Sequence, residues 1–318
     1  MKLIKPKFEI IEQAAGLDGM YKQIELAGRT CYRSEDKITI DSAKGFVERM
    51  IKSGHGAMLE HGTVYLKIPA GMYSFLDNEF DDCNDIKDSF FSNPYTRIHC
   101  QDGYFYISTN YRVLIENFSE DFIPKLLLFI CEPTEYHEKR VCVRFTCDRG
   151  VSHEFVRHRV FSFAQESTRY CNYSKDKFGN EVTFIIPCWA DSLALQKACN
   201  RSIVSSDEFG KLFNEYYYYL TGKEETYFKP WEITPERNFV TSLQMSEQLY
   251  LELLNQGWKP QQARAVLPNA LKTELVMTGF VSDWVHFFKL RNADSAHPQA
   301  RELAKPLYEE FLNRKYIN

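Results

Sequence analysis

The residues between Arg157 and Tyr170 hold the side chains best suited to chemistry, because three arginines and a histidine alternate there with hydroxyl and aromatic residues. Each arginine presents a planar fork of donors that matches phosphate and carboxylate oxygens and keeps its charge. Three such cations held close together repel one another unless a polyanion joins them. The segment therefore predicts a site for a phosphorylated, nucleotide-like ligand.

Two simpler interpretations of the same charges stay open. An arginine-rich stretch is often only a solvated helix face. Apolar side chains flank the charges, however, which indicates that the segment is partly buried; they are Val156, Val160, Phe161 and Phe163. A half-buried arginine needs a partner, and Glu154 or Glu166 could provide a local one.

The composition limits the class of protein. With 318 residues the chain could form one large domain or two, and a formal net charge of -4 argues against bulk nucleic-acid binding. The nine cysteines are odd in number and form no Cys-x-x-Cys pair, so we expect free thiols in a reducing cytoplasm. We expect neither a secretory segment nor a membrane span.

The hydrophobic pattern predicts a mixture of strands and helices in one α+β domain over residues 1–318. Strands are predicted at residues 8–11, 64–68, 104–108 and 141–146. Helices are predicted at residues 20–26, 40–53, 123–131, 149–159, 192–220, 239–255, 261–266, 270–279, 283–290 and 299–314. The helix at 149–159 would carry Arg157 and His158 at its end.

Several familiar catalytic motifs are missing. Ser167 and His158 are close in sequence, but no Gly-x-Ser-x-Gly elbow occurs and we expect no strand to present Ser167 at a sharp turn. His153 and His158 are five residues apart, which misses the spacing of a helical zinc pair. We therefore expect neither a hydrolytic triad nor a metal site. No glycine-rich loop for a dinucleotide or a phosphate occurs either, so a nucleotide would be held by another kind of binding site.

The spacing Arg157-His158-Arg159, seven residues, then Ser167 resembles the signature of the flavin-dependent thymidylate synthases. Four other segments resemble parts of that family: Gly28-Arg-Thr-Cys-Tyr-Arg-Ser, Gly54-His-Gly-x-x-Leu-Glu-His61, Ala263-Arg-Ala-Val-Leu-Pro268 and His286-Phe-Phe-Lys-Leu-Arg291. The resemblance fails at about residues 75–140, which we interpret as an insertion relative to compact members.

The resemblance implies a fold, a reaction and a set of ligands. The fold would be a central antiparallel or mixed sheet flanked by helices, in a homotetramer whose active sites lie between subunits. The reaction would be the reductive methylation of dUMP to dTMP, with FAD, methylenetetrahydrofolate as carbon donor and NADPH as reductant. No nucleic-acid polymer, membrane or metal would take part.

The resemblance also assigns roles to residues. The cofactor would contact His61, Thr63, Arg157, His158, Arg159, Gln165, Ser282 and His286. The substrate would contact Glu154, Arg157, Gln165, Glu166, Ser167, Thr168, Arg169, Arg264 and Arg291. Arg291 would be catalytic, because a fixed cation beside uracil favours its N3-deprotonated form, and the electron-rich ring is then a better nucleophile at C5. No enzyme thiolate would be needed.

Three positions depart from the pattern of the family. Gln165 stands where many members have glutamate, and Glu154 stands where glutamine is common. A carboxylate at position 154 is unfavourable beside a phosphate unless an arginine screens it. Phe280 replaces a polar or basic flavin contact and cannot donate a hydrogen bond from its side chain.

Other functions fit parts of the sequence. Pro187-Cys188-Trp189 superficially resembles the nucleophile of the cysteine-dependent thymidylate synthase, but the following histidine is absent, so we interpret Cys188 as a packing residue. The segment 157–169 could stack and bind single-stranded RNA, or the chain could be a scaffold that has lost catalysis. An absorbance spectrum with and without dUMP discriminates among these hypotheses.

Overall fold

The computed structural model describes residues 1–71, 90, 93–175, 179–200 and 234–318, which fall into two compact units. The larger unit comprises Pro6–Cys171 and Lys272–Asn318, and the smaller one comprises Met1–Lys5 and Asn172–Leu271. We describe each unit by itself. The single catalytic domain inferred from the sequence stays a prediction, as does the insertion at 75–140.

The larger unit holds two antiparallel sheets and most of the helices. Its strands are β2 (Lys7–Ile11), β3 (Thr63–Pro69), β4 (Arg97–Gln101), β5 (Tyr104–Asn110), β6 (Arg140–Asp148), β7 (Ser162–Gln165) and β9 (Lys272–Phe280). Its helices are α1 (Gly16–Tyr32), η1 (Glu35–Lys37), α2 (Ser42–Lys52), α3 (Gly56–Leu59), α6 (Tyr111–Asn117), α7 (Ile123–Leu127), α8 (Arg149–Phe155), α13 (Val281–Arg291) and α14 (Pro298–Asn313). The expected α+β fold is confirmed.

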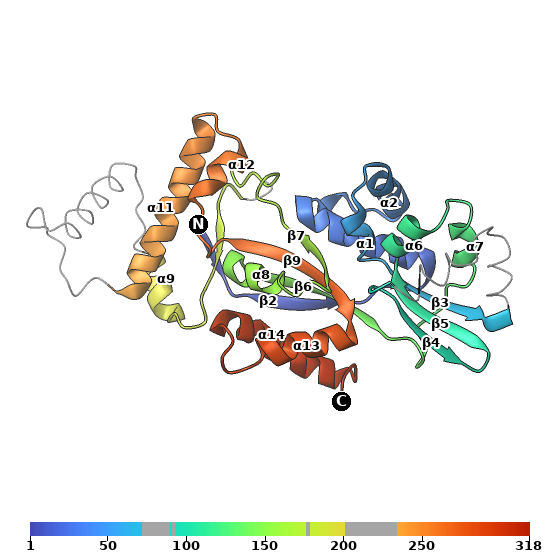
Figure 1. The fold of residues 1–318 in the computed structure, drawn as a ribbon. Helices are drawn as coiled ribbons and strands as arrows, with labels where there is room; N and C mark the ends of the chain where they lie inside the picture. The colour runs from blue at the N-terminus through green and yellow to red at the C-terminus, as the bar shows by residue number, and fades with distance from the viewer. Residues whose placement is uncertain (72–89, 91–92, 176–178, 201–233) are drawn as a thin grey trace, which may run out of the picture. The chain divides into compact units, whose positions relative to one another are not determined.

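The four-stranded sheet of the larger unit has the order β2-β6-β9-β7, and every neighbouring pair is antiparallel. One face carries the apolar side chains of Val143, Phe145, Leu275 and Met277, which pack with those of α8, α13 and α14. Those three helices lie along this face (Figure 1). On the opposite face α1 contributes Ala27 to a small apolar cluster, and farther along the strands this face is charged.

The second sheet of the larger unit has the order β3-β5-β4. Its apolar side chains, such as Val64, Leu66 and Ile107, pack with residues of α1, α2, α6 and α7. Residue Thr63 at the start of β3 is tied to the N-terminal part of the unit, because the side chain of Gln13 bonds both its N–H and its carbonyl at 2.8 Å.

The helix predicted at residues 270–279 is wrong, because this segment forms the central strand β9. Alanine, leucine, lysine, glutamate and methionine favour a helix locally, but pairing with β6 and β7 on both sides overrides that propensity. Side chains therefore alternate between the faces, so that Lys272 and Glu274 share one face while Leu275 and Met277 share the other.

Three other predictions need correction. The helix predicted at residues 149–159 ends at Phe155, where the chain turns, so Arg157 and His158 lie in that turn. The helix predicted at 123–131 ends at Leu127, because Ile130 bridges Leu66 beside β3. A strand, β7, does precede Ser167, contrary to expectation.

The smaller unit contains the parallel pair β1 (Lys2–Ile4) and β8 (Thr183–Ile185). It also contains the helices α9 (Ser192–Asn200), α11 (Pro235–Asn255), α12 (Pro260–Ala263) and η4 (Arg264–Val266). The rest of the helix predicted at 192–220 lies outside the described residues. No helix in the described part of the chain has both the length and the apolar character needed to cross a membrane.

Gly279 is required for the packing of β9. A Cβ at this position would stand 2.6 Å from ring atoms of Phe161, whose side chain is buried. We expect Gly279→Ala to lower the free energy of unfolding by about 1–3 kcal/mol, measured by urea denaturation. Gly45→Ala is the control, because its nearest neighbour would be at 3.6 Å and alanine favours a helix. Equal stabilities of the two variants would contradict this account.

Candidate functional site

Two strands of the four-stranded sheet run directly into helices that fold back over the same face. Asp148 ends β6 and caps α8 by accepting a hydrogen bond from the N–H of Val151 at 2.7 Å. Phe280 ends β9, and its N–H donates to Asp283 in the first turn of α13 at 3.1 Å. Since β6 and β9 are antiparallel, the two helices start at opposite ends of the sheet. Their C-terminal ends meet.

Arg291, the last residue of α13, is held where those ends meet. Its Nη1 donates to the carboxylate of Glu154 at 2.5 Å, and its Nη2 donates to the carbonyl oxygen of Glu154 at 2.7 Å. Its Nε donates to Nε2 of His158 at 3.0 Å. The carbonyl contact also places positive charge at the C-terminal end of α8, where the helix dipole favours it. The guanidinium is therefore fixed along one side.

His158 must be neutral in this arrangement. Arginine Nε can only donate, so Nε2 of His158 accepts and the imidazole proton sits on Nδ1. Burial, together with the charges of Arg291 and His286, lowers the pKa of His158 to about 4. The ring lies 5.0 Å from that of Phe287, centroid to centroid, in the aromatic layer beneath the helix. His158 thus acts here as an acceptor that orients Arg291.

We expect the free energy of unfolding to fall in acid, because His158 is neutral in the folded protein. The pKa of His158 is about 4 in the folded protein and 6.5 in the unfolded chain. Its contribution to stability is therefore complete above pH 6.5 and is lost as the pH falls towards about 4. Side-chain NMR of His158 should give a midpoint near 4, and Arg291→Ala should raise it because one positive charge is removed. A midpoint near 6.5 in the unchanged protein would contradict the bond with Arg291.

The predicted substrate residues around β7 divide between the two faces of the sheet. Gln165 points to the α8 face, where its Nε2 donates to the hydroxyl of Ser152 at 2.8 Å. The next residue, Glu166, points to the opposite face and forms an ion pair with Lys272 at 2.8 Å. The side chains of Glu166 and Lys272 are only 1% and 8% exposed. Glu166 is thus neutralised inside the protein rather than presented to a ligand.

Glu166 belongs to a network that the sequence did not predict. Lys272 also bonds Glu274 at 2.8 Å, and Arg33 reaches Glu274 at 3.3 Å and Glu166 at 3.7 Å. Burial alone would raise the pKa of Glu274, but the charges of Lys272, Arg33 and Arg144 hold it below its ordinary value. The helix predicted at residues 270–279 concealed this network. Only the two-residue alternation of a strand places Lys272 and Glu274 on one face.

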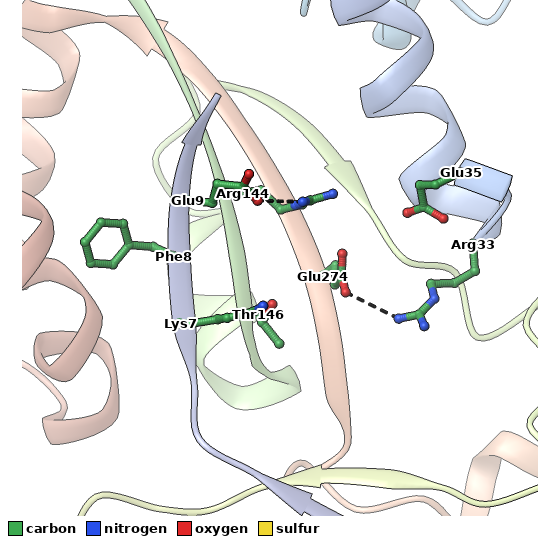
Figure 2. Close-up of a pocket in the computed structure, with 8 residues that line it drawn as sticks. All are labelled: Lys7, Phe8, Glu9, Arg33, Glu35, Arg144, Thr146 and Glu274. Carbon is green, nitrogen blue, oxygen red and sulfur yellow. Dashed lines mark hydrogen bonds and ion pairs between the residues drawn. The ribbon is translucent and has the colours of Figure 1, made fainter. Parts of the chain in front are cut away.

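A cavity of about 530 Å³ opens over this charged face. Figure 2 shows Arg33 directed at Glu274 and Arg144 directed at Glu9, which it meets at 2.5 Å. Lys7, Phe8, Glu35 and Thr146 complete the lining. The lining holds three cations and three carboxylates, and a lining balanced in this way does not favour a phosphate dianion.

The turn after α8 and the turn after β7 present the remaining arginines. Arg157, Arg159 and Arg169 are exposed, and neither Arg157 nor Arg159 has an ion pair within the described residues. Ser167 accepts the N–H of Arg169 at 3.3 Å, and its own N–H donates to the carbonyl of Cys31 at 2.9 Å. Thr168 is buried. The local carboxylates pair elsewhere, so Arg157 and Arg159 keep their donors for a ligand.

The predicted flavin residues lie in two environments. His61 and Thr63 are buried, and Nδ1 of His61 hydrogen-bonds the hydroxyl of Thr278 at 2.8 Å. Burial and the charge of Arg140 lower the pKa of His61 to about 3. Ser282 and His286 are exposed at the outer side of α13. His286 lies 6.3 Å from His158 between ring centroids, so it joins the cluster around Arg291.

Arg140 was missed by the sequence analysis. It is buried between His61 and Phe280, and its Nη1 donates to the carbonyl of Glu60 at 3.1 Å and to the hydroxyl of Thr63 at 3.4 Å. Its Nε is buried without a hydrogen bond among the described residues. Arg97 and Arg140 both approach the ring of Phe280, at 4.5 and 5.5 Å. Two arginines thus lie beside the position where the resemblance implied a polar or basic flavin contact.

Arg264 lies in the smaller unit, on η4 and exposed, so the structure does not relate it to the residues of the larger unit. The structure therefore brings together Glu154, His158, His286 and Arg291, while Gln165 is placed on the same face of the sheet. It separates Glu166, His61 and Thr63 from that cluster by burial or by face. The assignment of ligands to these residues stays a prediction.

The family model described as thymidylate synthase complementing protein matches residues 137–314, which include α8, β7, β9, α13 and α14. The chain belongs to this family. The resemblance drawn from the Arg-His-Arg motif is thereby confirmed.

Two curated relatives share one name, and a solved structure carries another. The flavin-dependent thymidylate synthase of Pyrococcus furiosus is 26% identical over 202 residues, covering 64% of this chain and 66% of the relative. That of Corynebacterium glutamicum is 30% identical over 156 residues, covering 49% and 50%. The chain thus spans about half to two thirds of the length of these relatives.

A crystal structure of the UMP/dUMP methylase PolB from Streptomyces cacaoi, bound with 5-Br dUMP, aligns with 98% of this chain and 93% of the PolB chain. The sequence identity is 16% and the TM-score is 0.39.

Proposed function

We propose that this protein is a flavin-dependent thymidylate synthase that methylates dUMP to dTMP, with FAD as cofactor and methylenetetrahydrofolate and NADPH as co-substrates. The observation that carries the proposal is the fixed guanidinium of Arg291, bonded to Glu154 and His158, in a chain of this family. We further propose a homotetramer in the cytoplasm, where the free thiols of the described cysteines would stay reduced.

Arg291 is proposed to bind the uracil ring. Three of its five N–H donors are used by Glu154 and His158, which leaves two for a ligand. Donors and positive charge beside the ring stabilise negative charge at N3 and O4, which increases electron density at C5. The proton from N3 passes to solvent. Such activation requires no cysteine nucleophile.

The exposed arginines are proposed to hold the phosphate groups of the ligands. Arg157 and Arg159 fit the diphosphate of FAD, because exposed guanidinium forks match phosphate oxygens in pairs. Ser167 and Arg169, in the turn after β7, suit the single phosphate of dUMP, and we assign Gln165 and Thr168 to the same ligand. For Arg264, in the smaller unit, the substrate role is the one that the family resemblance implies. When bound and reduced by NADPH, the flavin would supply the hydride for the reduction of the transferred carbon.

The fit of FAD to the other predicted residues is uneven. Ser282 and His286 are exposed and can reach a ligand as they stand. His61 and Thr63 are closed off from solvent, so they can meet a flavin only if the start of β3 opens. Arg140, whose Nη1 lies 3.4 Å from the hydroxyl of Thr63, is the charged group beside them.

Absorbance spectroscopy tests the proposed function. The purified protein, supplied with FAD, should retain a flavin spectrum after gel filtration, and NADPH should bleach it at a rate that depends on dUMP. Conversion of dUMP to dTMP should require methylenetetrahydrofolate. A protein that keeps no flavin at saturating FAD would exclude the proposal, and tight, salt-dependent RNA binding would favour the alternative.

A further inference from the structure

The pair formed by Glu154 and Arg291 has a consequence for the chemistry of the bound pyrimidine. Glu154 is 27% exposed and Arg291 is 16% exposed, so both charges are partly withdrawn from water. Their distance of 2.5 Å makes the pair electrically neutral as a unit. A ligand beside Arg291 therefore meets hydrogen-bond donors whose positive charge is largely compensated.

We propose that Glu154 is a positioning residue that fixes the guanidinium of Arg291 and also moderates its charge, so that N3 of the bound pyrimidine ionises less readily than beside a lone arginine. The inference rests on the proposed function for the identity of the ligand. The position of Arg291 is seen in the structure and does not depend on the proposed function.

The two roles of Glu154 depend on different atoms. Position comes from both the side chain and the carbonyl oxygen of Glu154, together with Nε2 of His158. Charge compensation comes from the carboxylate alone. A glutamine at position 154 keeps an acceptor of the same reach but removes the charge, so Glu154→Gln separates the two roles. Glu154→Ala removes both side-chain contributions.

Among the described residues, the carboxylate that forms an ion pair with Arg291 is that of Glu154. The elements packed around the pair carry further charged and titratable groups. They are Arg149, His153, Arg157, His158 and Arg159 from α8 and the turn after it, Asp283, His286 and Lys289 from α13, and Arg301, Glu302, Lys305, Tyr308, Glu309 and Glu310 from α14. Asp148 bonds Gln299, and Asp294 bonds Arg301. His158 stays neutral above about pH 5 because its pKa is lowered to about 4. Glu154 is thus the carboxylate that sets the charge at Arg291.

The experiment uses 5-fluoro-dUMP, whose N3 proton ionises closer to neutral pH than that of dUMP because fluorine withdraws electrons. The ultraviolet spectrum of the bound ligand is followed against pH in the unchanged protein, Glu154→Gln and a control, Glu310→Gln. Glu310 pairs with Arg314 at 2.7 Å on the outside of α14, away from the cluster around Arg291. We expect Glu154→Gln to lower the midpoint of N3 ionisation by about one pH unit and Glu310→Gln to leave it unchanged. An unchanged or raised midpoint in Glu154→Gln overturns the moderating role.

The position of Arg291 is tested without any ligand. In protein with ¹⁵N-labelled arginine, the Nε–H signal of Arg291 should exchange slowly in the unchanged protein and in Glu154→Gln, and should exchange at least tenfold faster in Glu154→Ala. Equal exchange in all three proteins overturns the positioning role. If 5-fluoro-dUMP does not bind the unchanged protein, the proposed function fails while the exchange measurement still decides this role.

Discussion

Arg291→Ala is expected to lower kcat for dTMP formation by about 10²–10³-fold, because the variant lacks the fixed cation that would stabilise charge on the pyrimidine. The variant should remain folded, since Arg291 is the last residue of α13 and the aromatic core lies beneath it. Turnover measured with saturating dUMP, methylenetetrahydrofolate and NADPH gives the value, and thermal unfolding confirms the fold.

The matched control for Arg291→Ala is Arg301→Ala. Arg301 also pairs with a carboxylate, Asp294 at 2.6 Å, but it lies on α14 with its side chain 37% exposed. It should keep kcat within about twofold, as expected for an exposed pair that contributes little. Near-normal turnover in Arg291→Ala would remove the catalytic role assigned to this residue.

Lys272→Met is expected to lower the free energy of unfolding by about 3 kcal/mol at pH 7, because the buried carboxylate of Glu166 loses its ion pair with Lys272. Replacing both partners, as Lys272→Met with Glu166→Gln, should recover most of the loss, since no buried charge is then unpaired. Urea denaturation measures both variants. A double variant no more stable than the single one would show that the pair is not the cause.

The pH dependence of the Lys272 variant gives a second check. The pKa of Glu274 is lower in the folded protein than in the unfolded chain. Its ion pairs therefore stabilise the fold at any pH above the pKa of the unfolded chain, and this effect is lost as the pH falls through the pKa of the folded protein. The difference between the unchanged protein and Lys272→Met should therefore shrink in acid. Lys22→Met is the control: Lys22 meets Asp18 at 2.6 Å on an exposed helix surface, and its loss should cost less than about 1 kcal/mol.

The binding chemistry inferred for residues 157–170 stays a prediction, and it could be drawn from the sequence because the information it needs is local. Guanidinium groups, hydroxyls and their spacing define a binding chemistry whatever the surrounding fold. The partners of the carboxylates were not predictable in this way. Glu154 and Arg291 are 137 residues apart, and their contact depends on the antiparallel register of β6 and β9. Glu154 and Glu166 were both candidate partners for nearby arginines, yet each pairs with a residue far along the chain.

The errors in secondary structure at β9 and at β7 have different physical origins. Residues 270–279 are good helix formers, and the strand forms because both neighbours and both faces of β9 are provided by distant segments. In β7 the signal was present but short. Phe161, Phe163 and Gln165 alternate with the smaller Ser162 and Ala164, which is the two-residue period of a strand. Strand pairing to β9 then extends through Glu166, whose N–H donates to the carbonyl of Glu274 at 2.8 Å.

That alternation makes the length of the segment as important as its composition. Deleting one residue from β7 would reverse the phase of every side chain up to the turn. Glu166 would then face α8, on the same side as Glu154, while Lys272 would lose its buried counter-ion. One missing codon would thus change the charge on the face that carries Arg291 and remove a buried ion pair at once. The number of residues between Arg159 and Ser167, which is seven, thus decides which face of the sheet each side chain of β7 occupies. An insertion of two residues keeps the alternation and would be tolerated better than an insertion of one residue.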